Sequence, residues 1–259
     1  MNKVLFYRPK LKDLLRIKSD SDFQSFLVKQ SMKLYEKVCR EKGKGFGKVL
    51  APGSRHVEAR NLPRFPFKKI ILLDVEELDE ATKNAIDKTD KRISHIKQNL
   101  ECLDLQPESY DLVFCKETLH HLPRPVLGLY EMLRVCKNAV IIIEPYETFI
   151  GNILEKFNLS TKYEGDPKKE PKKRGQYKSC YVYRWNEKEL IKILNSYYLK
   201  SGYELYLTNF WLSNRFGISK NTLLKILGWI ISFLPFNRGN FMIALIVPGN
   251  SLPPEIKKV

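Results

Sequence analysis

The feature that most constrains the fold is a series of short apolar runs between residues 48 and 147, separated by longer mixed segments. The runs lie at 48–50, 70–74, 93–97, 111–115 and 139–144. Strands that are apolar on both faces are typical of a parallel sheet buried between helices. Residues 77–90 and 124–136 have the composition of such helices. The pattern therefore predicts an α/β fold with helices on both faces of the sheet.

Two further runs extend the predicted sheet. Residues 203–210 alternate enough to form a sixth strand, and residues 241–247 form a continuous apolar seventh. The sequence Asn-Glu-Lys-Glu at 186–189 resembles a capping box, with Asn in place of Ser or Thr, and opens a helix before the sixth strand.

The remaining segments predict how the chain is divided. Residues 1–47 are expected to form a helical cap, because 19–22 offer N-caps, apolar residues between Phe23 and Val38 share a face, and Gly43 can end the helix. The main domain is expected at 48–250. It carries an insertion at 148–200, which contains a Lys- and Pro-rich loop, and an apolar helical insertion at 212–240. Residues 251–259 are expected to be a loose tail.

Charge and cysteine content limit the class of protein. With 259 residues, 43% of them hydrophobic, the chain can bury a core without disulfides. A net charge of +16 favours acidic partners, although a basic solvated surface explains it equally well. The five cysteines show no metal-ligand spacing, which predicts reduced thiols in a cytoplasmic protein. The apolar runs are too short for a signal peptide or a membrane span.

Two surface segments have more than one interpretation. The segment 222–236 is apolar almost all round, so it is expected to pack against the protein's own core, a membrane surface or a second copy of the chain. The basic loop at 168–174 is either a solvated surface or a lid that attracts an anionic acceptor. Its neighbouring tyrosines could also stack single-stranded RNA, but no recognised RNA-binding module accompanies them, so nucleic acid is not the expected partner.

A tight turn follows the first predicted strand. Gly53 lies directly after this strand, and Asp74 ends the next strand about 20 residues later. A strand, a glycine turn, a crossover and a second strand that ends in an acid outline a nucleoside-binding α/β unit. As alternatives, Gly53 is a plain turn glycine and Asp74 is a helix N-cap.

Several motifs together resemble the class I S-adenosylmethionine-dependent methyltransferases, of the type 11-like kind. They are VLAPG at 49–53, LD at 73–74, SYDLVF at 109–114, LHHLPRP at 119–125, YEMLRV at 130–135 and IIEP at 142–145. The resemblance covers about residues 48–147, and the capped helix before the sixth strand extends it. It implies a Rossmann-like sheet of seven strands, mostly parallel with an antiparallel last strand, and S-adenosylmethionine as the cofactor.

The resemblance also implies roles for particular residues. Gly53 matches the first glycine of the cofactor loop, and Asp74 matches the acid that accepts from both ribose hydroxyls. Asn99 stands where the family usually has an acid that bonds the adenine amino group, and Leu100 would then form an apolar wall for the ring. A slipped register that uses Glu101 or Asp104 is the alternative for the adenine contact.

The glycine loop departs from the family pattern. Ala51, Arg55 and Val57 stand where the family has an acid and two further glycines. S-adenosylmethionine has no phosphates, so it needs a glycine cradle less than a dinucleotide does. Glu58 is a candidate to compensate, by binding the amino group of the cofactor. The altered loop leaves open an alternative, a binding or scaffold module that has lost catalysis, and it disfavours a nicotinamide oxidoreductase.

Other pocket candidates follow the fourth and fifth strands, because ligands bind at the carboxyl ends of such strands. The candidates are Lys116, expected among the cofactor residues, and Glu117, Glu144 and Tyr146. His120, His121 and Glu144 are the weak candidates for a catalytic base. Two adjacent histidines without a third ligand do not make a metal site, so no metal is expected.

The sequence thus predicts methyl transfer to an unidentified small-molecule, glycan or lipid-linked acceptor. The basic charge and the 222–236 helix favour an acceptor made at a membrane. The protein would then contact the membrane surface through residues 222–236.

Overall fold

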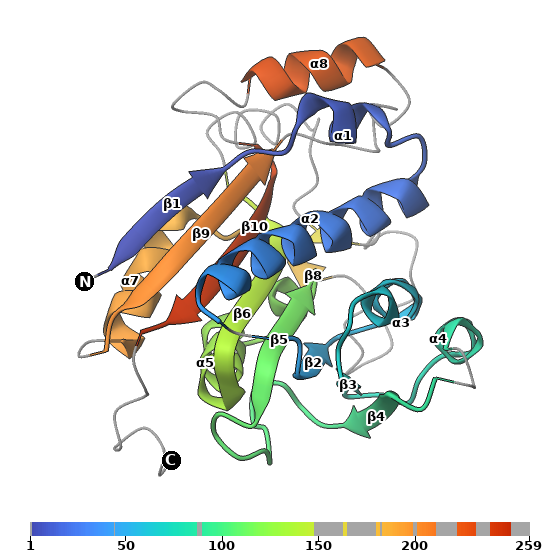
Figure 1. The fold of residues 1–259 in the computed structure, drawn as a ribbon, viewed down its shortest axis with the longest axis vertical. Helices are drawn as coiled ribbons and strands as arrows, with labels where there is room; N and C mark the ends of the chain where they lie inside the picture. The colour runs from blue at the N-terminus through green and yellow to red at the C-terminus, as the bar shows by residue number, and fades with distance from the viewer. Residues whose placement is uncertain are drawn as a thin grey trace.

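The molecule is built around one eight-stranded sheet with the strand order β1-β9-β10-β6-β5-β2-β3-β4 (Figure 1). The structure is a computed structural model, and it describes residues 2–43, 45–86, 90–147, 163–164, 180–181, 183–198, 201–210, 222–231 and 239–249. The predicted basic loop at 168–174 and the predicted tail at 251–259 lie outside these residues.

All seven predicted strands are present. They are β2 (Lys48–Pro52), β3 (Lys69–Asp74), β4 (Ile93–Lys97), β5 (Tyr110–Lys116), β6 (Cys136–Pro145), β9 (Tyr203–Phe210) and β10 (Phe241–Pro248). Neighbours among β4, β3, β2, β5 and β6 pair in parallel. The last strand, β10, is antiparallel to both β6 and β9, as predicted. A small separate sheet pairs β7 (Tyr163–Glu164) with β8 (Cys180–Tyr181).

The first residues of the chain correct the sequence prediction. Lys3–Tyr7 form strand β1, which pairs in parallel with β9 at the edge of the sheet. The expectation of helix throughout 1–47 is therefore wrong at its start, and the sheet has one strand more than the predicted seven. The run Val4 to Phe6 is apolar enough for a strand, but its partner lies about 200 residues later, where sequence pattern alone cannot locate it.

Helices cover both faces of the sheet, as predicted. One face packs against α2 (Asp20–Glu41) and α3 (His56–Asn61), and the other against α5 (Pro125–Val135) and α7 (Glu187–Tyr197). Asn186 caps α7 as expected, because its side chain accepts from the Glu189 N–H at 2.9 Å. The predicted helix at 77–90 is much shorter, since α4 spans only Glu80–Ala85.

Two helices lie together at the top of the view in Figure 1, by the carboxyl ends of the parallel strands. They are α1 (Leu11–Leu15) and α8 (Thr222–Ile231), which pack against each other. Within the described part of the chain, no helix is long and apolar enough to cross a membrane. Short 3-10 turns, η1 (Leu62–Arg64) and η2 (Leu119–His121), complete the described elements.

Candidate functional site

A cavity of about 920 Å³ lies at the carboxyl ends of β2, β3, β4 and β5. The turns after these strands supply its walls, and the start of α2 adds a further wall. All five predicted cofactor residues line it: Gly53, Asp74, Asn99, Leu100 and Lys116. The cavity lies where the strand order reverses between β2 and β5, which is the place where open α/β sheets bind ligands. Its volume is in the range of small-molecule sites.

Gly53 makes the turn that opens this site. Its φ is +62°, which L side chains rarely adopt, and its N–H donates to the Leu73 carbonyl at 2.7 Å. A Cβ added at this position would lie 2.1 Å from Thr118 Oγ1. Gly53 is therefore needed for the backbone conformation and for the close packing of Thr118 against the turn.

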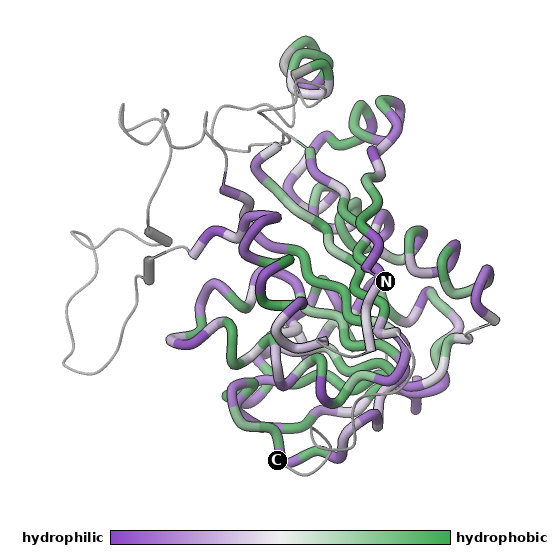
Figure 2. Tube along the Cα trace, turned by 90° about the vertical axis from the view of Figure 1, so that its left-hand side faces the viewer, coloured by the Kyte–Doolittle hydropathy of each residue, from purple (hydrophilic) through white to green (hydrophobic). Residues whose placement is uncertain are grey.

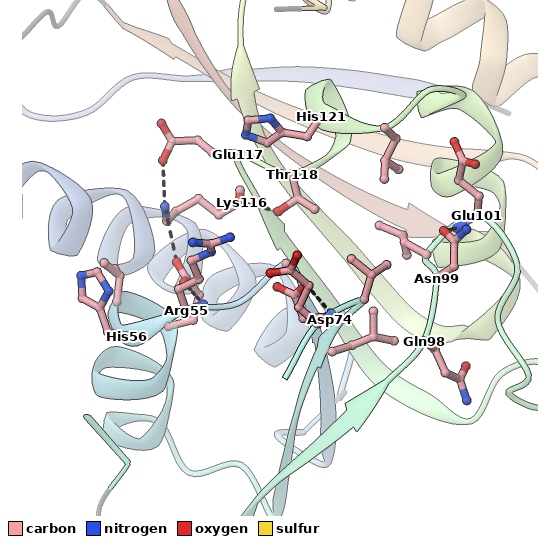
Figure 3. Close-up of a pocket in the computed structure, with 18 of the residues that line it drawn as sticks. Arg55, His56, Asp74, Gln98, Asn99, Glu101, Lys116, Glu117, Thr118 and His121 are labelled. Atoms are coloured by element: carbon pink, nitrogen blue, oxygen red, sulfur yellow. Dashed lines mark hydrogen bonds and ion pairs between the residues drawn. The ribbon is translucent and has the colours of Figure 1, made fainter. Parts of the chain in front are cut away.

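Asp74 ends β3, and its side chain lies in the cavity (Figure 3). Its Oδ1 accepts from the Glu76 N–H at 3.2 Å, which fixes the carboxylate at the edge of the site. The alternative role of Asp74 as a helix cap is wrong. The N-cap of α4 is Asp79, whose side chain accepts from the Thr82 N–H at 2.7 Å.

The turn after β4 forms the opposite wall. Asn99 lines the cavity, but its side-chain oxygen already accepts from the Glu101 N–H at 2.9 Å. Leu100 is buried beside it and adds an apolar side chain to the same wall. Glu101 also lines the cavity, and its carboxylate is held by the Arg124 N–H at 2.6 Å and by the Arg124 guanidinium at 2.9 Å. Asp104 lines a different hollow and is not among the residues that line this cavity.

Lys116 forms a buried charge cluster with two glutamates. Its side chain is 8% exposed, and its Nζ lies 2.8 Å from Glu117 Oε2 and 3.4 Å from Glu58 Oε1 (Figure 3). Glu58 Oε2 accepts from the Arg55 N–H at 3.0 Å. Burial lowers the pKa of Lys116, but the two carboxylates outweigh this effect and the pKa lies above the usual lysine value. The cluster thus holds an ammonium beside carboxylates in the wall of the cavity.

Glu117 takes part in this cluster through an uncommon backbone conformation. Its φ is +48°, and its N–H donates to the Ile143 carbonyl at 2.8 Å. Left-handed residues other than glycine are uncommon, and strained backbone is concentrated at functional sites.

The three candidates for a catalytic base separate in space. His120 and Glu144 are buried and do not line the cavity, and His120 Nδ1 lies 2.5 Å from Glu144 Oε2. Glu144 Oε1 also accepts from the N–H groups of Thr118 and Leu119, so this carboxylate holds the η2 turn in place. His121 does line the cavity, and its ring contacts that of His120 with centroids 4.2 Å apart.

Sequence reasoning missed several residues of the site. Asp20 and Gln24, from the first turns of α2, line the cavity. Gln24 Oε1 is buried and has no hydrogen-bond partner among the residues that the structure describes. Thr118 and Gln98 are further wall residues. Gln98 could have been predicted as a wall residue from its position just before Asn99. Nothing in the residue spacing of α2 indicates that the start of this helix lies at the cavity. Among the described residues, no group of three His, Cys, Asp or Glu side chains could hold a metal ion.

The fold and the site together define an α/β protein with a cavity at the carboxyl ends of its parallel strands. Residues 51–143 match a family model described as a methyltransferase domain. No curated protein sequence matches the chain.

Solved structures extend the likeness over most of the chain. The magnesium protoporphyrin IX methyltransferase of Synechocystis, with bound S-adenosylhomocysteine, is 13% identical and superposes with a TM-score of 0.52 over 88% of this chain and 87% of that one. The YcgJ protein of Bacillus subtilis is 14% identical and superposes with a TM-score of 0.55 over 86% of this chain and 99% of that one. A chain in the complex between the Trm112 methyltransferase activator of Haloferax volcanii and a methyltransferase is 12% identical. It superposes with a TM-score of 0.50 over 81% of this chain and 85% of that one. The chain thus matches a methyltransferase domain over residues 51–143, and it shares its fold with these solved structures.

Proposed function

We propose that the cavity binds S-adenosylmethionine and that the protein transfers its methyl group to an acceptor. The observation that carries this proposal is the meeting of Gly53, Asp74, Asn99 and Lys116 in one cavity, from the ends of four neighbouring strands. The altered glycine loop does not close the cavity, because Arg55 and Val57 line its wall and leave the volume of about 920 Å³.

Asp74 is the residue we assign to the ribose. Its carboxylate stands at the end of the second strand of the nucleoside-binding unit, where an acid accepts from two hydroxyls. Leu100 is assigned to the face of the adenine ring. Asn99 is assigned to the adenine edge through its NH₂ group or backbone, because its side-chain oxygen is already bonded to the Glu101 N–H.

The Lys116 cluster is assigned to the amino-acid end of the cofactor, which carries an ammonium and a carboxylate. Glu58 and Glu117 supply carboxylates for the ammonium, and Lys116 supplies the cation for the carboxylate. These charges compensate for the acid that the family has at the position of Ala51.

When bound, S-adenosylmethionine would supply an electrophilic methyl group on its sulfonium, and transfer of this group to an acceptor oxygen, nitrogen or carbon would break the sulfur–methyl bond and leave S-adenosylhomocysteine. The protein contributes positioning and exclusion of water. His121 is the side chain we propose for accepting a proton from the acceptor, because it alone of the three sequence candidates lines the cavity. His120 and Glu144 are proposed to position the η2 turn that carries it.

The acceptor is proposed to be a small-molecule, glycan or lipid-linked compound, met in the cytoplasm. Reduced thiols support this location, since Cys39, Cys102, Cys115 and Cys136 form no disulfides. We also propose that the 222–236 segment, of which α8 is the described part, contacts a membrane at its periphery. The net charge of +16 supports contact with an anionic surface.

Calorimetry with S-adenosylhomocysteine tests the proposal. Wild type should bind, and Asp74→Ala should bind about 10- to 100-fold more weakly, because hydrogen bonds to a charged group contribute about 1.5–3 kcal/mol. Asp104→Ala is the matched control, since this acid lies outside the cavity. Absence of binding by wild type at high micromolar ligand would support the inactive scaffold instead, and equal binding by Asp74→Ala would refute the site assignment.

A further inference from the structure

Helix α8 exposes apolar side chains and buries a lysine. Leu223, Leu227 and Ile230 are 72%, 48% and 53% exposed, whereas Lys225 is 3% exposed. The spacing of three and four residues places the three aliphatic side chains on one side of the helix. Single exposed apolar residues are normal, but a row of large ones on one helix side indicates a surface that contacts something else.

Polar contacts determine which side of α8 faces the protein. The Lys225 ammonium donates to the Ile17 carbonyl, and the Trp229 indole N–H donates to the Pro9 carbonyl at 3.3 Å. Both acceptors lie in the segment that carries α1. These contacts direct Lys225 and Trp229 inward, so Leu223 and Leu227 face outward. Figure 2 shows α8 at the outer end of the molecule, with hydrophobic residues along it.

The segment beneath α8 is strongly basic. Its exposed cations are Arg8, Lys10, Lys12, Arg16 and Lys18. Asp13 is the one acidic residue between positions 8 and 18, and it is engaged by Lys33 at 3.6 Å and by the Gln30 amide at 3.1 Å. An apolar helix side therefore lies beside a strip of positive charge.

A groove continues this basic strip between α1 and α2. It has a volume of about 390 Å³, and its cations are Arg16, Lys29, Lys33 and Arg64. The carboxylates in it are Asp13 and Asp22, and Asp22 accepts from the backbone N–H groups of Lys18 and Ser19. The groove therefore has space and net positive charge for an anionic head group.

We propose that this α1–α8 surface, made of Leu223, Leu227, Ile230 and the cations of residues 8–18, docks on an anionic lipid bilayer. This inference deepens the membrane contact proposed above, since it names the lipid charge and adds α1 to the contact. Aliphatic side chains on one side with adjacent lysines and arginines are the features that bind a helix in the interface of a membrane. A second copy of the chain would not use the basic strip, because like charges would face each other.

The docking surface lies beside the candidate active site. Asp20 and Gln24 line the cavity, and they follow α1 directly in the chain. A bilayer on the α1–α8 surface would therefore lie close to the mouth of the cavity. An acceptor held in that bilayer could reach the site without leaving the lipid.

Vesicle flotation tests the docking. Wild type should float with vesicles of phosphatidylglycerol and phosphatidylcholine and remain in the dense fraction with phosphatidylcholine alone, and added salt should weaken the binding. Leu227→Gln/Ile230→Gln should partition about 100-fold more weakly, at roughly tenfold for each aliphatic side chain. Lys12→Glu/Arg16→Glu should lose at least about 25-fold, at roughly fivefold per charge.

Matched controls come from other parts of the surface. Phe6→Gln removes an apolar side chain of β1 that is 47% exposed. Lys68→Glu/Lys69→Glu inverts two exposed charges at the amino end of β3, whereas α1 and α8 lie by the carboxyl ends of the parallel strands (Figure 1). Both should float like wild type. S-adenosylhomocysteine binding and the unfolding midpoint of each variant verify that it is folded.

Three outcomes would overturn the inference. Wild type that does not float with anionic vesicles excludes the bilayer. Equal losses in the control variants show that the effect is not specific to this surface. A dimer in sedimentation that Leu227→Gln/Ile230→Gln converts to monomer, with flotation unchanged, assigns the apolar row to a second copy. Flotation needs no cofactor, so a failure of cofactor binding leaves its result intact.

Discussion

Replacement of Lys116 by methionine should destabilise the protein markedly. The change keeps much of the side-chain volume but leaves Glu58, whose side chain is 5% exposed, without its cation. Removal of one partner from a buried ion pair costs about 3–5 kcal/mol, because the remaining charge stays buried. We expect the lower end, about 3 kcal/mol, since Glu117 is 26% exposed and can turn to water. For a protein of this size, that loss lowers Tm by roughly 6–12 °C.

A double-mutant cycle separates the charge effect from packing. Lys116→Met/Glu58→Gln removes both charges, and glutamine at 58 can still accept from the Arg55 N–H. The double variant should return to within about 1 kcal/mol of wild type, because replacing a whole buried pair is often nearly neutral. Urea unfolding of the four proteins at neutral pH gives the coupling energy.

An exposed ion pair provides the control. Lys83 Nζ lies 2.9 Å from Glu80 Oε1, closer than Lys116 lies to Glu58, but the two side chains are 54% and 81% exposed. Lys83→Met should therefore leave the unfolding midpoint unchanged, because water screens the pair. The reasoning fails if Lys116→Met is as stable as Lys83→Met, or if Glu58→Gln does not restore stability to Lys116→Met.

Four further predictions concern the site and its supports. The stability difference between wild type and Lys116→Met, measured by urea unfolding at several pH values, should stay constant from about pH 6 to 9 and shrink above about pH 10.5. A raised lysine pKa contributes stability that is lost as the pH rises through the pKa of the folded state. A difference that shrinks near neutral pH would contradict this. Lys116→Met/Glu58→Gln should weaken the binding of S-adenosylhomocysteine, measured by calorimetry, about tenfold or more. Its affinity for 5′-methylthioadenosine, which lacks the amino-acid end, should be unchanged. Equal losses of affinity for both ligands would show that Lys116 does not bind the amino-acid end. Gly53→Ala should cost about 2–4 kcal/mol in urea unfolding, from the positive φ and the overlap with Thr118, and a neutral result would mean that the turn rearranges freely. Asn186→Ala should cost about 1 kcal/mol, whereas Asn186→Asp should keep the cap of α7; a loss in both would mean that the hydrogen bond to Glu189 is not its source.

The strands that are buried on both faces could be predicted, because such burial requires a continuous run of apolar residues. Strands β3 and β5 are almost wholly apolar in their central residues because helices cover both their faces. The edge strand β1 could not be recognised in the same way, since none of its residues is fully buried and its partner is far along the chain.

Topology also explains which site residues were predictable. Gly53, Asp74 and Lys116 each end or follow a parallel strand, so their meeting at one edge follows from the fold. Counting along a turn is less secure, and it left Asp104 open as an alternative although that residue faces another hollow. Contacts between residues of separate elements, such as the Thr118 side chain against the Gly53 backbone, depend on tertiary packing and leave no spacing signal.

Strand β1 has a consequence for the order in which the protein can fold during synthesis. Asn2 Oδ1 accepts from the Tyr203 N–H, across 201 residues of sequence. At about 5–20 residues per second, the ribosome completes that partner roughly 10–40 s after the first strand has emerged. Residues 3–7 must therefore wait for β9, while β2 to β6 can already pair with one another. An N-terminal fusion partner that folds quickly should hinder this late step, which makes the C-terminus the better place for a purification tag.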